Sequence, residues 1–386
     1  MSNVYRLNSE QTAVVELAKK IADESLAPFA VDVDAKSRFP REGINALAKS
    51  GFLGLNIPRE LGGMGQGLRV TAAILDEIAQ RDASAAMVYK MHLCGCAAYA
   101  SFPVAAKEAI AGAVAGKHLT TLAWSERGSR SHFWAPVSQA VQADGKVTLN
   151  AYKSWVTSAG EADGYVVSTR TAGTTGPTDT MLYLLLKGDK GFEVKGQWDG
   201  LGMRGNASAP MVLEDCVVPA ERALCKHNEG FPTMLNVVLP WFNIGNAAIS
   251  VGISEAAIKS TTSHLTTKRF EEAGMKLADL PTLRARLAQM RIETDRARAH
   301  LVGVLDSVEQ PGPLTTLMVL ESKGAAAESA IRVTDIAMQS CGGAAFSKHL
   351  SVERNFRDAR AAAVMGPTSD VLQEFIGRAL CGMPLF

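Results

Sequence analysis

Two short segments combine tryptophan, glycine and small hydroxyl residues in patterns that suit a flat heterocyclic ligand. The first, LAWSERGSRSH at 122–132, reads as the end of a strand that leads into a turn rich in serine and glycine. Serine hydroxyls and backbone N–H groups in such a turn can point several hydrogen-bond donors at one ligand, although most turns of this composition bind nothing. The segment alone therefore leaves both interpretations open.

The second segment, KSWVTSAGEAD at 153–163, places Trp155 and Thr157 two residues apart on a predicted strand. Side chains two apart on a strand project from the same face, so an indole and a hydroxyl would meet one ligand. A tryptophan can pack against a flavin ring while a threonine hydroxyl donates to a ring nitrogen. A tryptophan in a β-sheet core is an equally common explanation of the same residues.

Three blocks of the chain must position these segments. Residues 1–118 predict a helical domain, because apolar residues such as Val14, Ala18 and Ile21 recur every three or four positions. Residues 119–228 predict a β domain of short strands separated by Gly, Asp and Thr turns. Residues 229–386 return to helical spacing and predict a helical bundle. The fold class is therefore α+β, and the lack of a GxGxxG turn after a strand argues against a Rossmann fold.

Composition favours a small-molecule substrate and two or three packed domains. The 386 residues carry 40 Lys and Arg against 39 Asp and Glu, so no overall field favours nucleic acid or an anionic membrane. No secretory signal or long apolar run is found, which predicts a cytoplasmic protein without a membrane span. The six cysteines form no CxxC pair, so reduced thiols are expected and no metal site.

Nine short segments, in their order and spacing, resemble the acyl-CoA dehydrogenase family from one end of the chain to the other. The resemblance implies an N-terminal helical domain, a β-barrel-like middle domain and a C-terminal four-helix bundle. It also implies FAD as cofactor, a CoA thioester or a related small molecule as substrate, and a homotetramer. The segments are PRELGGMG, EIAQRDAS, WSERGSRS, NAYKSWVTSAGEAD, LGMRG, LEDCVVP, MQSCGG, VERNFRDAR and PTSDVLQEFIGRALCG.

The resemblance assigns residues to the flavin ring and to the rest of FAD. Around the ring it implies a strand with backbone and hydroxyl groups facing the flavin, and a tryptophan–threonine pair beside it. Farther along the cofactor it implies a serine near the pyrophosphate, an arginine that meets the pyrophosphate, a threonine on the adenosine side, and a glutamine with two glycines that reaches the FAD of a neighbouring subunit. The matching residues are Leu122, Trp124, Ser125, Trp155, Thr157, Ser131, Arg269, Thr368, Gln339, Gly342 and Gly343.

This sequence departs from the family at the catalytic base. Most members abstract a proton next to the thioester with a glutamate, and here that position is Gly366, followed by Pro367. Other members place the glutamate on the first helix of the C-terminal bundle, where this chain has Val238 and Leu239. Both known positions therefore lack an acid–base side chain.

Further substitutions fall where the family contacts substrate. His132 replaces an aspartate, Asn236 stands where an aspartate is common, and Arg378 matches an arginine near the CoA adenine. A displaced base is one explanation of Gly366, with His92, His132 and Asp370 as candidates. The other explanation is a reaction that needs no base at this position.

We favour flavin and oxygen chemistry, as a monooxygenase or oxidase, because the base is absent while the groups expected around the flavin remain. The resemblance includes relatives that work as flavin monooxygenases. The alternative is an acyl-CoA dehydrogenase with a relocated base. A more remote alternative is a non-catalytic, DNA-associated flavoprotein, which the balanced charge argues against.

Overall fold

The computed structural model describes residues 3–129, 132–269 and 274–385. Its first block is helical, as expected. The first helix begins at a capping box, in which the Asn8 side chain accepts from the N–H of Gln11 and the Gln11 side chain accepts from the N–H of Asn8. The elements are α1 (Ser9–Ser25), α2 (Ala30–Lys36), α3 (Arg41–Lys49), α4 (Leu68–Ala79), α5 (Ala83–Ser101) and α6 (Lys107–Val114), with the 3₁₀ turns η1 (Phe52–Gly54) and η2 (Arg59–Leu61).

The middle block forms two small sheets. In the first, β1 pairs with β4 in parallel and β4 with β5 antiparallel; the second has the order β2-β3-β7-β6 and is antiparallel throughout. The strands are β1 (Thr120–Ala123), β2 (Ala140–Ala143), β3 (Lys146–Val156), β4 (Gly164–Arg170), β5 (Thr180–Leu186), β6 (Phe192–Val194) and β7 (Ala209–Pro219), and the turn η3 (Ala220–Arg222) follows.

The third block is a helical bundle in which α8, α9 and α10 pack against one another and α12 packs against α8 and α10. Immediately before α8, the π-helical turn η4 (Met234–Val238) takes up one more residue per turn than an α-helix. The elements are α7 (Gly230–Thr233), η4, α8 (Leu239–Thr267), η5 (Leu277–Asp279), α9 (Pro281–Glu309), α10 (Thr315–Cys341), α11 (Gly343–Phe346), α12 (Val352–Ala359), α13 (Ala361–Val364) and α14 (Ser369–Leu380).

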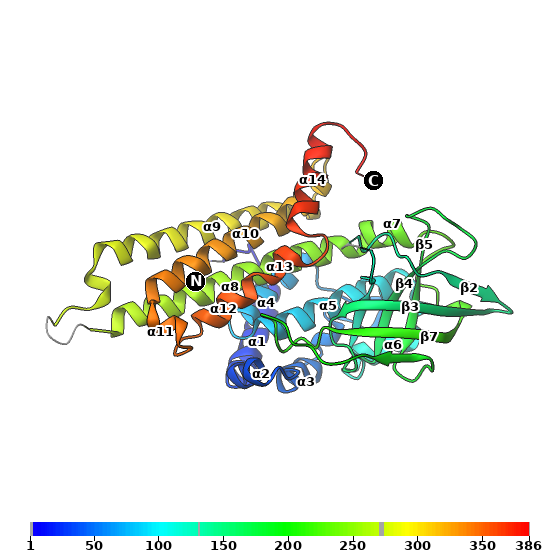
Figure 1. Cartoon of the computed structure of the whole chain (residues 1–386), viewed down its shortest axis with the longest axis horizontal. Coiled ribbons are helices and arrows are strands. Elements are labelled where there is room, and N and C mark those ends of the chain that lie inside the picture. The colour runs from blue at the N-terminus through cyan, green and yellow to red at the C-terminus, as the bar shows by residue number, and fades with distance from the viewer. Residues whose placement is uncertain (1–2, 130–131, 270–273, 386) are drawn as a thin grey trace.

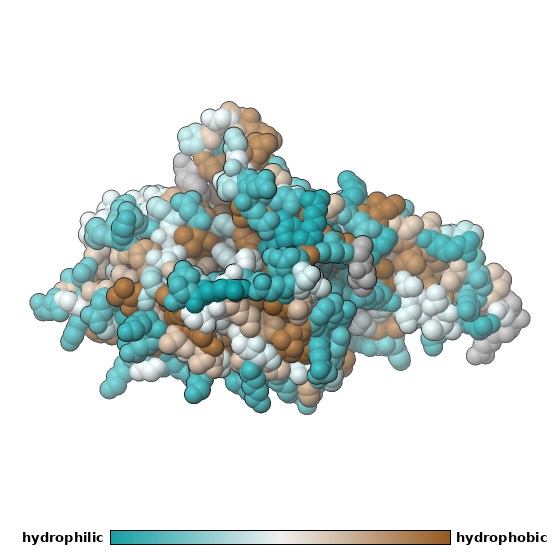
Figure 2. All heavy atoms as spheres, turned by 180° about the vertical axis from the view of Figure 1, so that it is seen from behind, coloured by the Kyte–Doolittle hydropathy of each residue, from teal (hydrophilic) through white to brown (hydrophobic). Residues whose placement is uncertain are grey.

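Helix α5 joins the three blocks, since it packs against β1 on one side and against α8 on another (Figure 1). The stretch Gly230–Thr267 is long and apolar enough to cross a membrane, but 78% of its most apolar window is buried inside the protein. It is the central helix of the bundle. From behind, the surface mixes polar and apolar side chains, and apolar atoms gather on the projecting C-terminal helix (Figure 2).

Candidate active site

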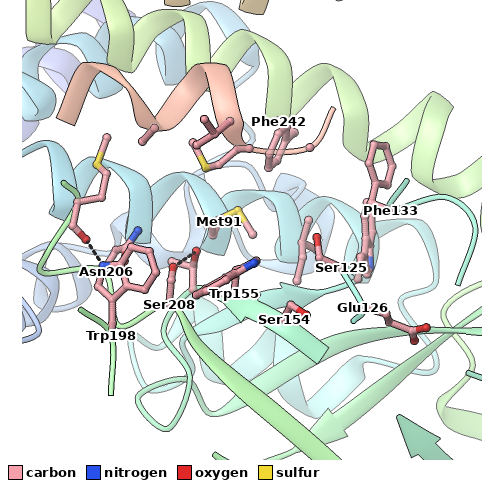
Figure 3. A pocket seen from close by; sticks show the side chains of 18 of the residues that line it. Met91, Ser125, Glu126, Phe133, Ser154, Trp155, Trp198, Asn206, Ser208 and Phe242 are labelled. Carbon is pink, nitrogen blue, oxygen red and sulfur yellow. Dashed lines mark hydrogen bonds between the residues drawn. The ribbon is translucent and has the colours of Figure 1, made fainter. Parts of the chain in front are cut away.

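A cavity of about 780 Å³ lies where the three domains meet. Its helical side carries Met91 from α5 and Phe242 from α8, and its β side carries Ser154, Trp155 and Ser208 (Figure 3). A concave, largely apolar space with a few polar groups between domains is the usual form of a cofactor or substrate site. The cavity is therefore the candidate active site.

Six residues predicted from the sequence line this cavity together. They come from β1 and the two residues after it, from the end of β3 and the residue after it, and from the segment after α13. Segments that lie far apart along the chain thus meet at one space. The six residues are Leu122, Trp124, Ser125, Trp155, Thr157 and Gly366.

Trp155 reaches the cavity through an irregular strand. The pairing of β3 with β7 shifts register between Lys153 and Val156, which is a β-bulge, and Trp155 within it has a φ of 56°. The indole is 64% exposed and lies edge to face with Trp198, with 5.7 Å between the ring centroids. The two-residue alternation expected for Trp155 and Thr157 is therefore broken, although both line the cavity.

Polar atoms around the cavity suit a flat, hydrogen-bonding heterocycle. The hydroxyls of Thr157 and Ser208 lie 3.1 Å apart. The indole Nε1 of Trp124 and the amide Oδ1 of Asn206 are buried and have no hydrogen-bond partner within the described part of the chain. One donor and one acceptor thus remain for a ligand. The exposed Trp155 ring, the hydroxyl pair and these two atoms fit the isoalloxazine ring of FAD.

The one carboxylate among the described lining residues is Glu126. It accepts from Nζ of Lys153 at 2.6 Å, and from the N–H groups of Val137 and Ser138 at 2.6 and 2.8 Å. Burial opposes its ionisation, but the charge and hydrogen bonds of Lys153 and Ser138 outweigh burial and lower the pKa of Glu126. Its oxygens are already engaged, so it is poorly suited to accept a substrate proton.

The three candidate replacement bases lie outside the cavity. Nδ1 of His92 accepts from the N–H of Thr120 at 3.0 Å and Nε2 lies 2.8 Å from the Leu53 carbonyl, so both ring nitrogens are occupied. Burial lowers the pKa of His92 to about 4, which keeps the ring neutral. His132 is exposed and stacks on Trp134 at 4.7 Å, and Asp370 is exposed in the first turn of α14.

Several predicted binding residues do not line the cavity. Asn236 is exposed in η4, Thr368 caps α14 by accepting from the N–H of Val371, and Arg378 donates to the Pro384 carbonyl. Of the two alternative base positions, Leu239 lines the cavity and Val238 does not. The substrate roles of His132, Asn236 and Arg378 stay predictions.

The residues predicted to reach FAD from farther away lie at the opposite end of the molecule. Gln339 lies in the last turn of α10, Gly342 and Gly343 begin the turn into α11, and Arg269 follows α8, at the end of the bundle away from the strands (Figure 1). Within one chain they do not line the cavity, and their role toward a neighbouring subunit stays a prediction. Ser131 lies outside the described residues.

Sequence reasoning missed Lys90 and Phe242. Phe242 lines the cavity, and Nζ of Lys90 lies 3.7 Å from the centroid of its ring. A detectable signal was present, because Lys90 is the one lysine in the mostly apolar run DASAAMVYKMHLCG. A lysine in such a run is expected to be buried and to need a partner.

The order helical, β, helical around an interdomain cavity lined by tryptophans and hydroxyls defines a class of three-domain cofactor-binding enzymes. Three family domains match the chain: the acyl-CoA dehydrogenase N-terminal domain over residues 8–107, the middle domain over 121–216 and the C-terminal domain over 228–381. The chain belongs to the acyl-CoA dehydrogenase family. The predicted family, fold class and FAD cofactor are confirmed.

Similar proteins span almost the whole chain. "Probable acyl-CoA dehydrogenase FadE25" of Mycobacterium tuberculosis is 28% identical over 98% of this chain and 97% of its own length. "Acyl-CoA dehydrogenase, short-chain specific" of Clostridium acetobutylicum is 26% identical over 95% and 97%. The solved structure of butyryl-CoA dehydrogenase from Megasphaera elsdenii superposes with a TM-score of 0.91 at 26% identity, covering 97% of this chain and 99% of the other.

Proposed function

We propose that this protein is an FAD-dependent oxidoreductase that acts on an acyl-CoA thioester, or a related small molecule, by flavin and oxygen chemistry. The observation that carries the proposal is the lack of a free base at the cavity. Among the described lining residues, Gly366 replaces the family's glutamate and the carboxylate of Glu126 is held by Lys153. Abstraction of a proton next to a thioester needs a positioned acceptor, so another reaction fits these residues better.

Bound FAD would supply the redox chemistry. The chain's own residues would hold and shield the reactants. Trp155 offers an exposed ring, Trp124 has an Nε1–H donor without a partner among the described residues, and Thr157 brings a hydroxyl to the cavity lining. On the helical side, Met91 and Phe242 present apolar surface that keeps water from the reactants. Gly366 adds space on that side in place of a side chain.

The second candidate is α,β-desaturation, and the names of the relatives favour it, since those cited above are called dehydrogenases. It requires a proton acceptor in the cavity. The described lining residues provide Glu126, whose ion pair with Lys153 would first have to break.

Anaerobic mixing of the holoenzyme with saturated acyl-CoAs separates the two candidates. We expect little or no bleaching of the flavin absorbance with butyryl-CoA or octanoyl-CoA. Flavin reduced beforehand with dithionite should then place an isotopically labelled oxygen atom in the thioester product when mixed with labelled O2. Rapid anaerobic bleaching with formation of an enoyl-CoA would overturn the oxygen proposal in favour of desaturation.

A homotetramer is part of the proposal. Gln339, Gly342 and Gly343 lie away from the cavity of their own chain, and Phe346 beside them is 85% exposed. A second copy is the simplest partner for the exposed Phe346 side chain, because closed homo-oligomers bury the same surfaces of identical chains. We propose that this end of each copy contacts the FAD bound to a neighbouring copy.

A further inference from the structure

Lys90 is a buried lysine whose amine lacks a hydrogen-bond partner. It lies on α5 in a run that is buried from Ala83 to Tyr99, and only 1% of its surface is exposed. Nζ makes no hydrogen bond within the residues that the structure describes. A buried ammonium group without such partners is unfavourable. A ligand that brings an acceptor to this amine would therefore be stabilised by it.

Packing directs the Lys90 side chain to the cavity wall. Gly245 of α8 leaves room for its stem, since a Cβ there would lie 2.6 Å from Lys90 Cγ and 3.1 Å from Cδ. The amine then lies over Phe242, 3.7 Å from the ring centroid. Phe242 is half-buried and lines the cavity, so its ring contacts both the amine and the cavity. A change of the Phe242 rotamer would connect the two.

Among the residues that the structure describes, no nearby group neutralises Lys90. The titratable groups that face it in the described structure are Cys94 on α5 and Lys323 on α10. Burial raises the pKa of Cys94 to about 12, so the thiol is neutral. Lys323 donates to the carbonyls of Ala362, Met365 and Pro367 at 2.7, 3.0 and 2.6 Å. Burial lowers the pKa of Lys323 to about 7, and the residue brings no negative charge to Lys90.

The cavity also has the apolar lining residues Met91, Leu239, Val364 and Met365. Its arginines are already engaged: Arg357 pairs with Asp34, Arg360 pairs with Asp335, and Arg127 lies over the Tyr152 ring. We propose that Lys90 binds an acidic group at the far end of the substrate's acyl part, so that the substrate class is acyl thioesters that end in a carboxylate. This inference rests on the proposed function for the thioester itself. A carboxylate that displaces the Phe242 ring would form a charge-assisted hydrogen bond in a water-poor site.

Calorimetric binding to the oxidised holoenzyme under anaerobic conditions tests the inference. The probes are glutaryl-CoA and adipyl-CoA, each paired with the methyl ester of its free carboxylate. We expect wild type to bind each acid at least about tenfold more tightly than its ester, since a charged hydrogen bond contributes roughly this much. Lys90→Met should remove the preference. Lys259→Met is the matched control, because Lys259 lies on α8 and donates to Gln80 outside the cavity.

Equal affinity of wild type for acid and ester, or a preference that survives in Lys90→Met, would refute the inference. If Lys90→Met loses FAD or does not fold, wild type still decides the question by proton uptake. Burial lowers the pKa of Lys90 to about 8, so near pH 8.5 the acid should bind with uptake of a proton and the ester without it. The same uptake for both would contradict the inference. These measurements need no turnover, so their outcome is independent of the oxygen-incorporation experiment.

Discussion

Nζ of Lys153 lies 2.6 Å from Oε1 of Glu126, and both side chains are almost completely buried. The lysine also donates to the carbonyl of Ser168 on β4, while the glutamate accepts from the backbone before β2. The pair therefore ties β3 to β4 and to the segment before β2. It holds the β side of the cavity in place and occupies the carboxylate that desaturation would require.

Glu126→Gln should destabilise the protein by about 3–5 kcal/mol, because Lys153 would remain buried without its counter-charge. Urea denaturation of the holoenzyme measures the change. The double variant Glu126→Gln, Lys153→Met should recover much of the loss, since it removes both charges. A stable Glu126→Gln protein that has lost turnover would instead make Glu126 the missing base.

Lys90 makes stability depend on pH in a defined direction. Burial lowers its pKa to about 8 from an ordinary 10.5, so between these values the folded protein binds fewer protons than the unfolded chain. The free energy of unfolding should therefore rise with pH between about 8 and 10.5, by up to about 3 kcal/mol in total. Below this window Lys90 is charged in both the folded and the unfolded chain, so its burial as an ammonium group is destabilising. The melting temperature of wild type relative to Lys90→Met should increase from pH 7 to pH 10. If the difference in melting temperature stays the same, the pKa of Lys90 is not lowered in the folded protein.

Gly366→Glu returns a carboxylate to the cavity at the family's position. General-base catalysis contributes about 10² to 10⁴ in rate. Anaerobic flavin reduction by butyryl-CoA should therefore be faster in the variant than in wild type, by part of this factor. Gly366→Gln, which has the same size without the base, is the control. Equal rates for the two variants would mean that the new side chain acts by shape alone.

Phe346→Glu should weaken both assembly and FAD retention, because it places a charge on an apolar side chain that is 85% exposed beside Gly342 and Gly343. Light scattering should show a tetramer for wild type and smaller species for the variant, with loss of flavin on gel filtration. Val104→Glu changes another exposed apolar side chain, on the N-terminal domain, and serves as the control. A monomeric wild type with full FAD occupancy would contradict the prediction.

The order of the domains could be predicted because the period of apolar residues changes along the chain. Apolar residues recur every three or four positions around Val14 and Ala18, and this segment forms α1. The β-rich run near Trp155 forms β3. Family, fold class and FAD follow from segments spread over the whole length, and the domain matches confirm them.

The shape of the site could not be predicted from these patterns. The bulge at Trp155 and the π-turn before Leu239 each add a residue that periodicity does not count, so side chains after them turn to other faces. The contact of Lys90 with Phe242 joins helices far apart in sequence and depends on the space left by Gly245.

Three of the five tryptophans in the sequence, Trp124, Trp155 and Trp198, line the cavity. Intrinsic fluorescence excited in the indole band therefore arises in large part at the site itself. Flavin absorbs where indoles emit, so a flavin bound in this cavity would quench the tryptophan fluorescence by energy transfer. The intrinsic fluorescence of the protein should therefore report how much cofactor is bound, and it can be followed during unfolding, dilution or reconstitution.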